Sequence, residues 1–289
     1  QVVRLSADGR TELVRVGGFH RPTSVSVNPT DGTVWVADYY NSQVVKLKPD
    51  GSGELVRKGG FNYPFSVSVN PTDGSVWVAD YSNNQVVKLW ADGTELVRVS
   101  GFSNPVSVSV NPTDGSVWVA DYSNNRVVKL LSSVPNGYNI GTDTGSHVIL
   151  PGFNRPYSVS VDSSDGTCWV ADYYNHKVVK VKADGSEKLV NVGGFYYPTS
   201  VSVNSTTGVV WVAEYYNNQV VKLDPNGTEL ARLSGFSYPR AVAVVDTGPG
   251  NYFSSASTGN TAHTYLAPGI YKAIFTVTDS DGNKDTATL

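Results

Sequence analysis

A short alternation of hydrophobic and polar residues returns along this chain at a spacing of about 42 residues. In the first complete copy, Ser and Val alternate over 24–28, a Pro-Thr-Asp-Gly turn follows, and a second hydrophobic run covers 34–37. Period-2 alternation is typical of a half-buried β-strand, and Asp-Gly is a preferred hairpin turn. The pattern therefore predicts two antiparallel strands joined by a tight turn.

Two further strands complete the predicted copy, at 43–47 and 54–57. The first of them follows a loop at 38–41 that carries two tyrosines, and the second follows a Pro-Asp-Gly turn. Four short antiparallel strands per repeat, with no 3.6-residue helical spacing, are typical of one blade of a β-propeller.

A tryptophan in the second strand marks each copy, and these markers are Trp35, Trp77, Trp118, Trp169 and Trp211. Residues 1–16 match the second half of a copy, and 240–246 match a first strand. We therefore predict an all-β fold: a six-bladed β-propeller with four-stranded antiparallel blades over 1–246. In this ring, 1–16 and 240–246 share the closing blade, which removes the open edges that five blades alone would leave.

The tail departs from the repeat. Residues 247–262 have the Gly/Ser/Thr composition of a linker or loop, and 263–289 return to strand-like alternation. The repeat supplies no second strand for the closing blade. We expect one of three outcomes: 269–279 folds back into that place, the tail adds a strand to another subunit, or the chain is truncated at both ends.

Several recurring phrases resemble NHL-type β-propeller repeats, in particular those of archaeal, methanogen-type cell-surface proteins. They are Gly-Phe, Ser-Val-Ser-Val, Trp-Val-Ala-Asp and Asn-Asn-Gln-Val-Val-Lys-Leu. Within 263–289, His-Thr-Tyr, Ala-Pro-Gly-Ile-Tyr and Thr-Val-Thr-Asp resemble the second half of a PKD domain, an immunoglobulin-like sandwich. These resemblances imply an extracellular or cell-surface protein whose propeller serves binding or architecture.

Charge and composition argue against nucleic-acid binding and membrane insertion. The formal net charge is −3 with both signs interleaved, so no basic face for nucleic acid is expected. No apolar run reaches 18 residues, so we expect no membrane insertion in this chain. The single cysteine, Cys168, is interpreted as a small buried hydrophobe. Asn204 and Asn226 open glycosylation sequons and are candidate modification sites.

Catalytic chemistry is not expected. Propeller enzymes gather metal ligands or acid–base residues at the central mouth, whereas the predicted inner strands here present serine and the four histidines are scattered. We therefore predict no cofactor, no metal and no catalytic residue. An acid ends the second strand of every copy: Asp38, Asp80, Asp121, Asp172 and Glu214. A ring of calcium ligands or glycan acceptors is one interpretation. A carboxylate that accepts loop N–H bonds is the favoured one.

One face of the predicted ring gathers aromatic residues in the loops between second and third strands and in those between blades. The Phe repeated in the latter is expected to be a core wedge. Tyr and Arg are common interface anchors. The candidate binding residues are Tyr39, Tyr40, Tyr63, Tyr81, Tyr122, Arg155, Tyr173, Tyr174, Tyr196, Tyr197, Tyr215, Tyr216, Tyr238 and Arg240.

The first functional hypothesis is a non-catalytic extracellular structural or adhesion protein that acts through protein–protein assembly. In this hypothesis the chain is a subunit of a surface layer or filament, with strand complementation by its tail. Its partners are other proteins or copies of itself. The alternatives are a carbohydrate-binding propeller that uses the Tyr/Asn/Arg-rich face for glycans, and a lactonase- or lyase-like enzyme.

Overall fold

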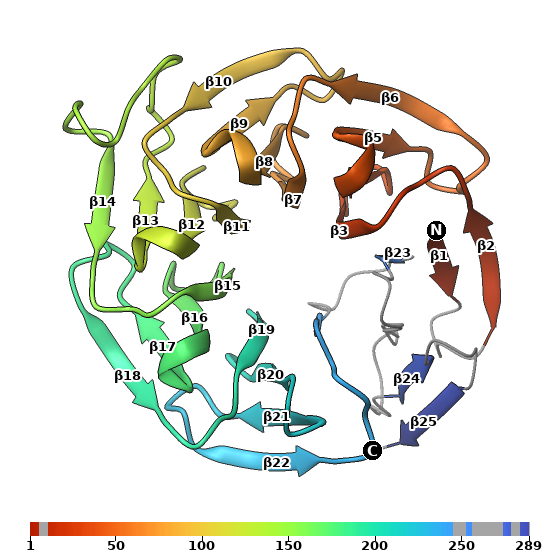
Figure 1. Ribbon diagram of the computed structural model, residues 1–289, viewed down its shortest axis with the longest axis vertical. Coiled ribbons are helices and arrows are strands. Elements are labelled where there is room, and N and C mark those ends of the chain that lie inside the picture. The colour runs from red at the N-terminus through yellow and green to blue at the C-terminus, as the bar shows by residue number, and fades with distance from the viewer. Residues whose placement is uncertain (6–10, 245–252, 256–273, 279–283, 289) are drawn as a thin grey trace.

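The chain forms a ring of β-sheets around a common axis (Figure 1). The computed structural model describes residues 1–5, 11–244, 253–255, 274–278 and 284–288. In this part of the chain, five four-stranded antiparallel sheets and one three-stranded sheet make up the ring. The prediction of an all-β, six-bladed β-propeller is confirmed.

Each complete blade runs outward from the axis in chain order. Blade 1 consists of β3 (Pro22–Val27), β4 (Val34–Asp38), β5 (Gln43–Leu47) and β6 (Glu54–Gly59). Blade 2 consists of β7 (Pro64–Val69), β8 (Val76–Asp80), β9 (Gln85–Leu89) and β10 (Glu95–Val99). Blade 3 consists of β11 (Pro105–Val110), β12 (Val117–Asp121), β13 (Arg126–Leu130) and β14 (His147–Leu150). Blade 4 consists of β15 (Pro156–Val161), β16 (Cys168–Asp172), β17 (Lys177–Val181) and β18 (Lys188–Val192). Blade 5 consists of β19 (Pro198–Val203), β20 (Val210–Glu214), β21 (Gln219–Leu223) and β22 (Glu229–Leu233).

The strand limits differ slightly from the predicted ones. The first strand begins two residues early because Pro22 already pairs with Asp38, and the fourth extends to Gly59. In blades 1–4 the loop after the second strand is a 3-10 turn: η1 (Tyr39–Asn41), η2 (Tyr81–Asn83), η3 (Tyr122–Asn124) and η4 (Tyr173–Asn175). None of the helices in the described residues is long and apolar enough to cross a membrane.

The hydrophobic core lies between neighbouring blades. Trp35 on β4 is fully buried and clusters with Phe61 and Val67 of the next blade. The Phe of five inter-blade loops is at most 7% exposed, which confirms its predicted role as a wedge: Phe61, Phe102, Phe153, Phe195 and Phe236. Cys168 is fully buried, as predicted.

The serines of the inner strands fasten one blade to the next. On β3, Ser24 and Ser26 accept hydrogen bonds through Oγ from the backbone N–H groups of Val67 and Val69, at 3.2 and 3.0 Å. The same pair of bonds recurs at every junction from blade 1 to blade 5. The alternating Ser-Val pattern therefore encodes the closure of the ring as well as the strand.

The closing blade is built from both ends of the ring. It contains β2 (Glu12–Val16), β1 (Val2–Leu5) and β23 (Phe253–Ser255), in that order from the perimeter inward. β23 pairs antiparallel with β1 and lies against β3 of blade 1. Residues 242 and 244 donate N–H bonds to Ser200 and Ser202, so they occupy the first-strand place beside blade 5.

Of the three outcomes left open for the tail, the one in which 269–279 supplies the missing second strand is wrong. β24 (Ile274–Thr278) pairs with β25 (Lys284–Thr288) in a separate two-stranded sheet, and β23 lies in the stretch 247–262 that was predicted to be a linker or loop. β23 is only three residues long and lies in a Gly/Ser-rich stretch. A strand this short shows no alternation of hydrophobic and polar residues that could be recognised in the sequence. Most of 263–289 lies outside the described residues, so its likeness to a PKD domain stays a prediction.

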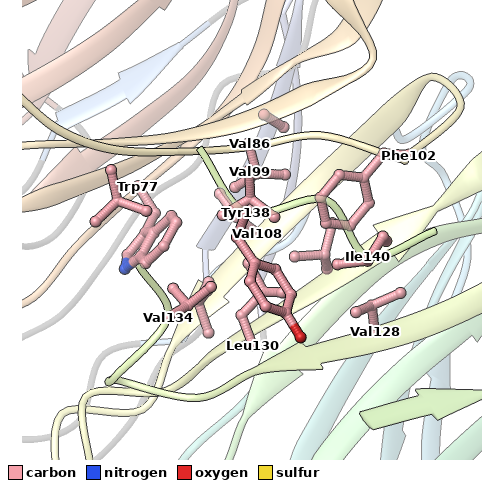
Figure 2. Packing of buried hydrophobic residues seen from close by; sticks show 14 of the residues in the cluster. Trp77, Val86, Val99, Phe102, Val108, Val128, Leu130, Val134, Tyr138 and Ile140 are labelled. Carbon is pink, nitrogen blue, oxygen red and sulfur yellow. The ribbon is translucent and has the colours of Figure 1, made fainter. Parts of the chain in front are cut away.

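The insertion at 132–146 packs on the edge of blade 2. Ser100 donates its N–H to the carbonyl of Tyr138 at 2.9 Å, and Ile140 donates to the carbonyl of Ser100 at 3.1 Å. Tyr138 and Ile140 are each 4% exposed and join the cluster around Phe102 (Figure 2). The insertion therefore covers the outer edge beside β10 within the chain itself.

Candidate functional site

The aromatic face that the sequence predicts, here called the tyrosine face, is built from two kinds of connection that meet in each blade. Tyr40 donates its N–H to the carbonyl of His20 at 3.0 Å, which ties the loop after β4 to the loop before β3. The face comprises 39–42, 81–84, 122–125, 173–176 and 215–218, together with 17–21, 60–63, 100–104, 151–155, 193–197 and 234–238.

The repeated acid is the anchor of these connections. Asp121 is fully buried and accepts the N–H of Ser103 at 2.7 Å and the side-chain amide of Asn124 at 2.9 Å. The equivalent backbone bond is made in all five complete blades, by Asp38, Asp80, Asp121, Asp172 and Glu214. This confirms the structural interpretation of the acid.

Burial determines the protonation behaviour of three of these acids. It raises the pKa of Asp80, Asp121 and Asp172 above the ordinary value, although the hydrogen bonds they accept oppose the shift. Their oxygens are already occupied by loop donors. These carboxyls therefore hold the loops and are not presented to a ligand.

Aromatic rings meet at the centre of the tyrosine face. Phe65 on β7 and Tyr157 on β15 come from blades 2 and 4, and their ring centroids lie 6.0 Å apart. Tyr122 and Tyr173 contact Tyr157 at 5.9 and 5.4 Å. Burial raises the pKa of Tyr157 to about 12, because a phenolate there would lose its hydration.

Sequence reasoning missed Phe65 and Tyr157. Both follow the proline that opens the first strand, where the copies differ: Thr23, Phe65, Val106, Tyr157, Thr199 and Arg240. The Ser-Val-Ser-Val that follows is nearly constant. The residue after the proline lies at the start of the innermost strand, so its six copies surround the axis. Its variation beside the constant Ser-Val-Ser-Val was the signal that could have identified it.

The predicted tyrosines gather in two groups on either side of this centre. In blades 1 and 2, the ring of Tyr63 stacks on Tyr39 at 4.8 Å and meets Tyr40 edge-on at 5.8 Å. Tyr81 lies 5.8 Å from Phe65. These contacts give a compact aromatic group with Tyr40 and Tyr63 exposed to solvent by 39% and 38%.

The second group covers blades 4 and 5. Tyr197 meets Tyr174 at 5.5 Å and Tyr216 at 5.0 Å, and Tyr215 contacts Tyr238 at 5.2 Å. Tyr196, Tyr216 and Tyr238 are between 47% and 50% exposed, more than any tyrosine of the first group. With Tyr157 as the bridge, the two groups form one continuous aromatic surface across the ring.

Three arginines lie over tyrosine rings of this surface. The guanidinium of Arg21 lies 4.9 Å from the Tyr40 ring centroid and donates to its hydroxyl at 2.6 Å. Arg155 lies over Tyr174 at 5.0 Å, and Arg240 over Tyr215 at 4.9 Å. The sequence prediction included Arg155 and Arg240 but not Arg21, although Arg21 and Arg155 occupy the same position before the first-strand proline.

The asparagines that follow the second strands make hydrogen bonds within the face. Asn41 donates to the carboxylate of Asp38 at 2.8 Å, and the same bond recurs in the other four blades. Asn84 and Asn218 accept N–H bonds from Asn104 and Tyr238 of the next inter-blade loop, at 2.8 Å each. His176 takes the same role, accepting the N–H of Tyr197 at 3.2 Å.

The exposed charge of the tyrosine face has one sign. The connections that form it contain no Asp or Glu, and the repeated acids behind them are buried. Arg21, Arg155 and Arg240 are all exposed. An approaching ligand therefore meets aromatic rings and positive charge.

The described histidines are held apart by their own contacts. His20 packs on Tyr40 at 5.0 Å, and Nδ1 of His147 lies 2.9 Å from the Tyr138 hydroxyl on the insertion. Within the described residues, no three His, Cys, Asp or Glu side chains are grouped as metal ligands would be. His263 lies outside the described residues.

Comparison with known proteins identifies the repeat. The NHL repeat model matches residues 19–47, 61–89, 102–130 and 195–223, so the chain carries NHL repeats. No curated protein sequence matches the chain.

Several solved structures share the fold. A catalytically inactive variant of virginiamycin B lyase from Staphylococcus aureus, solved with quinupristin, is 15% identical, with 99% of this chain and 87% of that chain covered and a TM-score of 0.66. A streptogramin B lyase is 14% identical, with 100% and 86% covered and a TM-score of 0.65. A propeller of a nidogen/laminin complex is 13% identical, with 81% and 92% covered and a TM-score of 0.64. Identities this low demonstrate a shared fold alone.

Proposed function

We propose, from the NHL-repeat propeller as premise, that this chain is a non-catalytic extracellular structural or adhesion protein whose tyrosine face binds protein partners. The observation that carries the proposal is the continuous surface of exposed tyrosines and arginines from blade 1 to blade 5. Tyr and Arg dominate the energetic centres of protein interfaces because they offer large rigid area together with hydrogen-bonding groups.

The surface is organised before any partner arrives. Each loop of the five complete blades is anchored through its buried acid, and Arg21 and Arg155 are already held on tyrosine rings. Binding to a surface of this kind loses little conformational entropy, which favours affinity. Among the propellers that share this fold, the one in the nidogen/laminin complex was solved with a protein partner.

The non-catalytic part of the proposal is supported by how the reactive side chains are used. The carboxyls of the face are buried beneath the loops they anchor, and His176 stands where blades 2, 3 and 5 have Asn. Burial also raises the pKa of the Cys168 thiol, which disfavours the reactive thiolate. The lyases that share the fold therefore supply no assignment of residues here.

Glycan binding is the second candidate. The exposed rings of Tyr196, Tyr216 and Tyr238 would serve as stacking platforms for sugars. Most asparagines of the face weigh against it, because the side chains of those after the second strand are occupied in loop anchoring and are not free to bind sugar hydroxyls.

The test removes the tyrosines that vary between blades. The variant Tyr40→Ser, Tyr174→Ser and Tyr216→Ser adopts the residue that blades 2 and 3 already have at this position, Ser82 and Ser123. A control variant, Leu55→Ser with Leu230→Ser, changes apolar residues on the perimeter that are at least as exposed as these tyrosines. Thermal unfolding establishes that both variants fold.

The measurement is retention of proteins from the source's extracellular fraction on immobilised protein, together with self-association by light scattering. We expect the tyrosine variant to retain less than about one tenth of the protein that wild type retains, and the control variant to retain as much as wild type. Equal retention by both variants would contradict the proposal. Sugar-specific binding on a glycan array, lost in the tyrosine variant alone, would establish the second candidate instead.

A further inference from the structure

The face opposite the tyrosine face, here called the turn face, carries the opposite charge. It consists of the turns between first and second strands and between third and fourth strands. In the complete blades these turns, the insertion included, hold eight exposed aspartates: Asp31, Asp50, Asp73, Asp92, Asp114, Asp143, Asp165 and Asp184. In the described part of this face, aromatic rings meet on the insertion, where Tyr138 lies 5.7 Å from His147, and Trp90 is an isolated aromatic side chain, 44% exposed.

The aspartates of the turn face are fixed in position. Asp92 accepts the N–H and the hydroxyl of Thr94 at 2.9 and 2.6 Å, and these bonds hold its pKa below the usual range. The pKa of Asp50 and Asp184 is lowered in the same way by Ser52 and Ser186. The carboxylates therefore stay ionised and point from rigid turns.

The lysines on the same side are largely withdrawn. Lys46 and Lys129 are each 7% exposed and lie over Trp35 and Trp118. Lys46 donates to the carbonyl of Ala91 in the next blade at 3.0 Å. The exposed cations of these turns are Lys48 and Lys182, and Lys182 lies 3.4 Å from Asp184. Lys88, Lys129 and Lys180 form ion pairs with Asp73, Asp114 and Asp165 at 3.5, 3.2 and 3.5 Å. The negative charge of the turn face therefore rests mainly on the other exposed aspartates, among them Asp31, Asp50 and Asp92.

From these two faces we infer that the partner of the tyrosine face is the turn face of a second copy of this chain. The arginines of one copy meet the aspartates of the next, whereas like faces would bring equal charges together. Such a contact joins two different surfaces, so it repeats without closing on itself and builds a head-to-tail filament. This inference rests on the proposed function, in which the tyrosine face binds protein.

Blade 5 indicates which part of the turn face is in contact. Its turn between first and second strands has Thr207 where blades 1–4 have an aspartate, and both sequons, at Asn204 and Asn226, lie in its turns. The acidic contact therefore belongs to blades 1–4. Glycans on blade 5 would leave it free.

The experiment is a charge swap, measured as mass by light scattering on unglycosylated protein. One variant combines Arg21→Glu, Arg155→Glu and Arg240→Glu, and the other combines Asp50→Lys, Asp92→Lys and Asp184→Lys. We expect the wild-type chain to form oligomers, each variant alone to stay monomeric, and an equimolar mixture of the two to regain at least twofold the monomer mass. Circular dichroism confirms folding of each variant.

A second measurement holds even where a variant fails to fold. The mass of wild-type oligomers should fall as NaCl rises from about 0.05 M to about 0.5 M, because screening weakens contacts between exposed charges. Two results overturn the inference: a wild-type chain that stays monomeric at every concentration, or an arginine variant that pairs with wild type alone and not with the aspartate variant. In either case, the wild-type chain can retain a different extracellular protein that the Tyr40→Ser, Tyr174→Ser, Tyr216→Ser variant fails to retain. That result would support the proposed function while this inference fails.

Discussion

At the scale of single residues, the function of a repeated side chain follows from what its copies have in common. The acid after the second strand makes the same bonds to the same loop in every complete blade, so it solves a folding problem. The residues that differ between copies, such as Tyr40 against Ser82, are free of that constraint. We therefore propose binding at the varied positions.

Replacing Asp121 by Ala should destabilise the protein by about 3 kcal/mol, because it leaves the N–H of Ser103 and the guanidinium of Arg126 without their buried acceptor. Chemical denaturation measures the loss. Asp184→Ala in an exposed turn is the control and should cost far less. Equal losses would mean that the buried acid does not anchor the loop.

Ionisation of the Tyr157 hydroxyl should lower the free energy of unfolding at alkaline pH. Its pKa is raised to about 12 by burial, whereas an unfolded tyrosine ionises near about 10. Between these values the unfolded state loses its proton and the folded state keeps it, so stability is present below the lower value and declines as pH rises toward the higher one. In Tyr157→Phe the hydroxyl is absent, so the unfolding free energy should fall by up to about 3 kcal/mol less over this pH range than in wild type. An identical alkaline profile in wild type and variant would refute the assignment.

At the scale of elements, the inner strands form the ring through their serines. Ser109→Ala should cost about 1 kcal/mol, because the N–H of Val161 in the next blade loses its acceptor at 3.1 Å. Urea unfolding provides the measurement. Ser237→Ala, in an exposed loop, is the matched control and should leave stability unchanged. A neutral Ser109 variant would show that packing alone joins the blades.

The closing blade depends on residues beyond the repeat. A chain that ends at Asp246 lacks β23 and leaves the inner edge of β1 unpaired, so it should unfold more easily and aggregate. A chain that ends at Thr258 keeps β23 and should behave as the full chain does. Thermal unfolding with light scattering distinguishes them. Equal stability of both truncated chains would mean that β23 does not close the ring.

The sequence allowed the repeated elements to be predicted and left the unique ones open. The same features recur in every copy: the tryptophan represented by Trp35, the tight turn between the first two strands and the Ser-Val strand. Their common spacing made the assignment of each blade support that of the others. β23 occurs once, and no pattern distinguishes Phe253–Ser255 from a linker. The candidate tyrosines were predictable from the loops, whereas the contact of Phe65 with Tyr157 joins blades 2 and 4 across the axis and needed the ring itself.

At the scale of the whole molecule, the propeller separates its chemistry between two faces. One presents tyrosine and arginine, the other presents aspartate turns, and the perimeter consists of outer strands (Figure 1). A ring with unlike faces has a direction. That direction is what ordered head-to-tail assembly through protein contacts requires.

The most direct measurement is site-specific photocrosslinking from the tyrosine face. A benzophenone amino acid replaces Tyr216, and in a control chain it replaces Leu55 on the perimeter; the two residues are equally exposed, at 49%. We predict that position 216 forms covalent adducts with a polypeptide in the extracellular fraction or with a second copy, and that position 55 does not. Adducts from position 55 alone, or from both positions alike, would contradict binding through the tyrosine face.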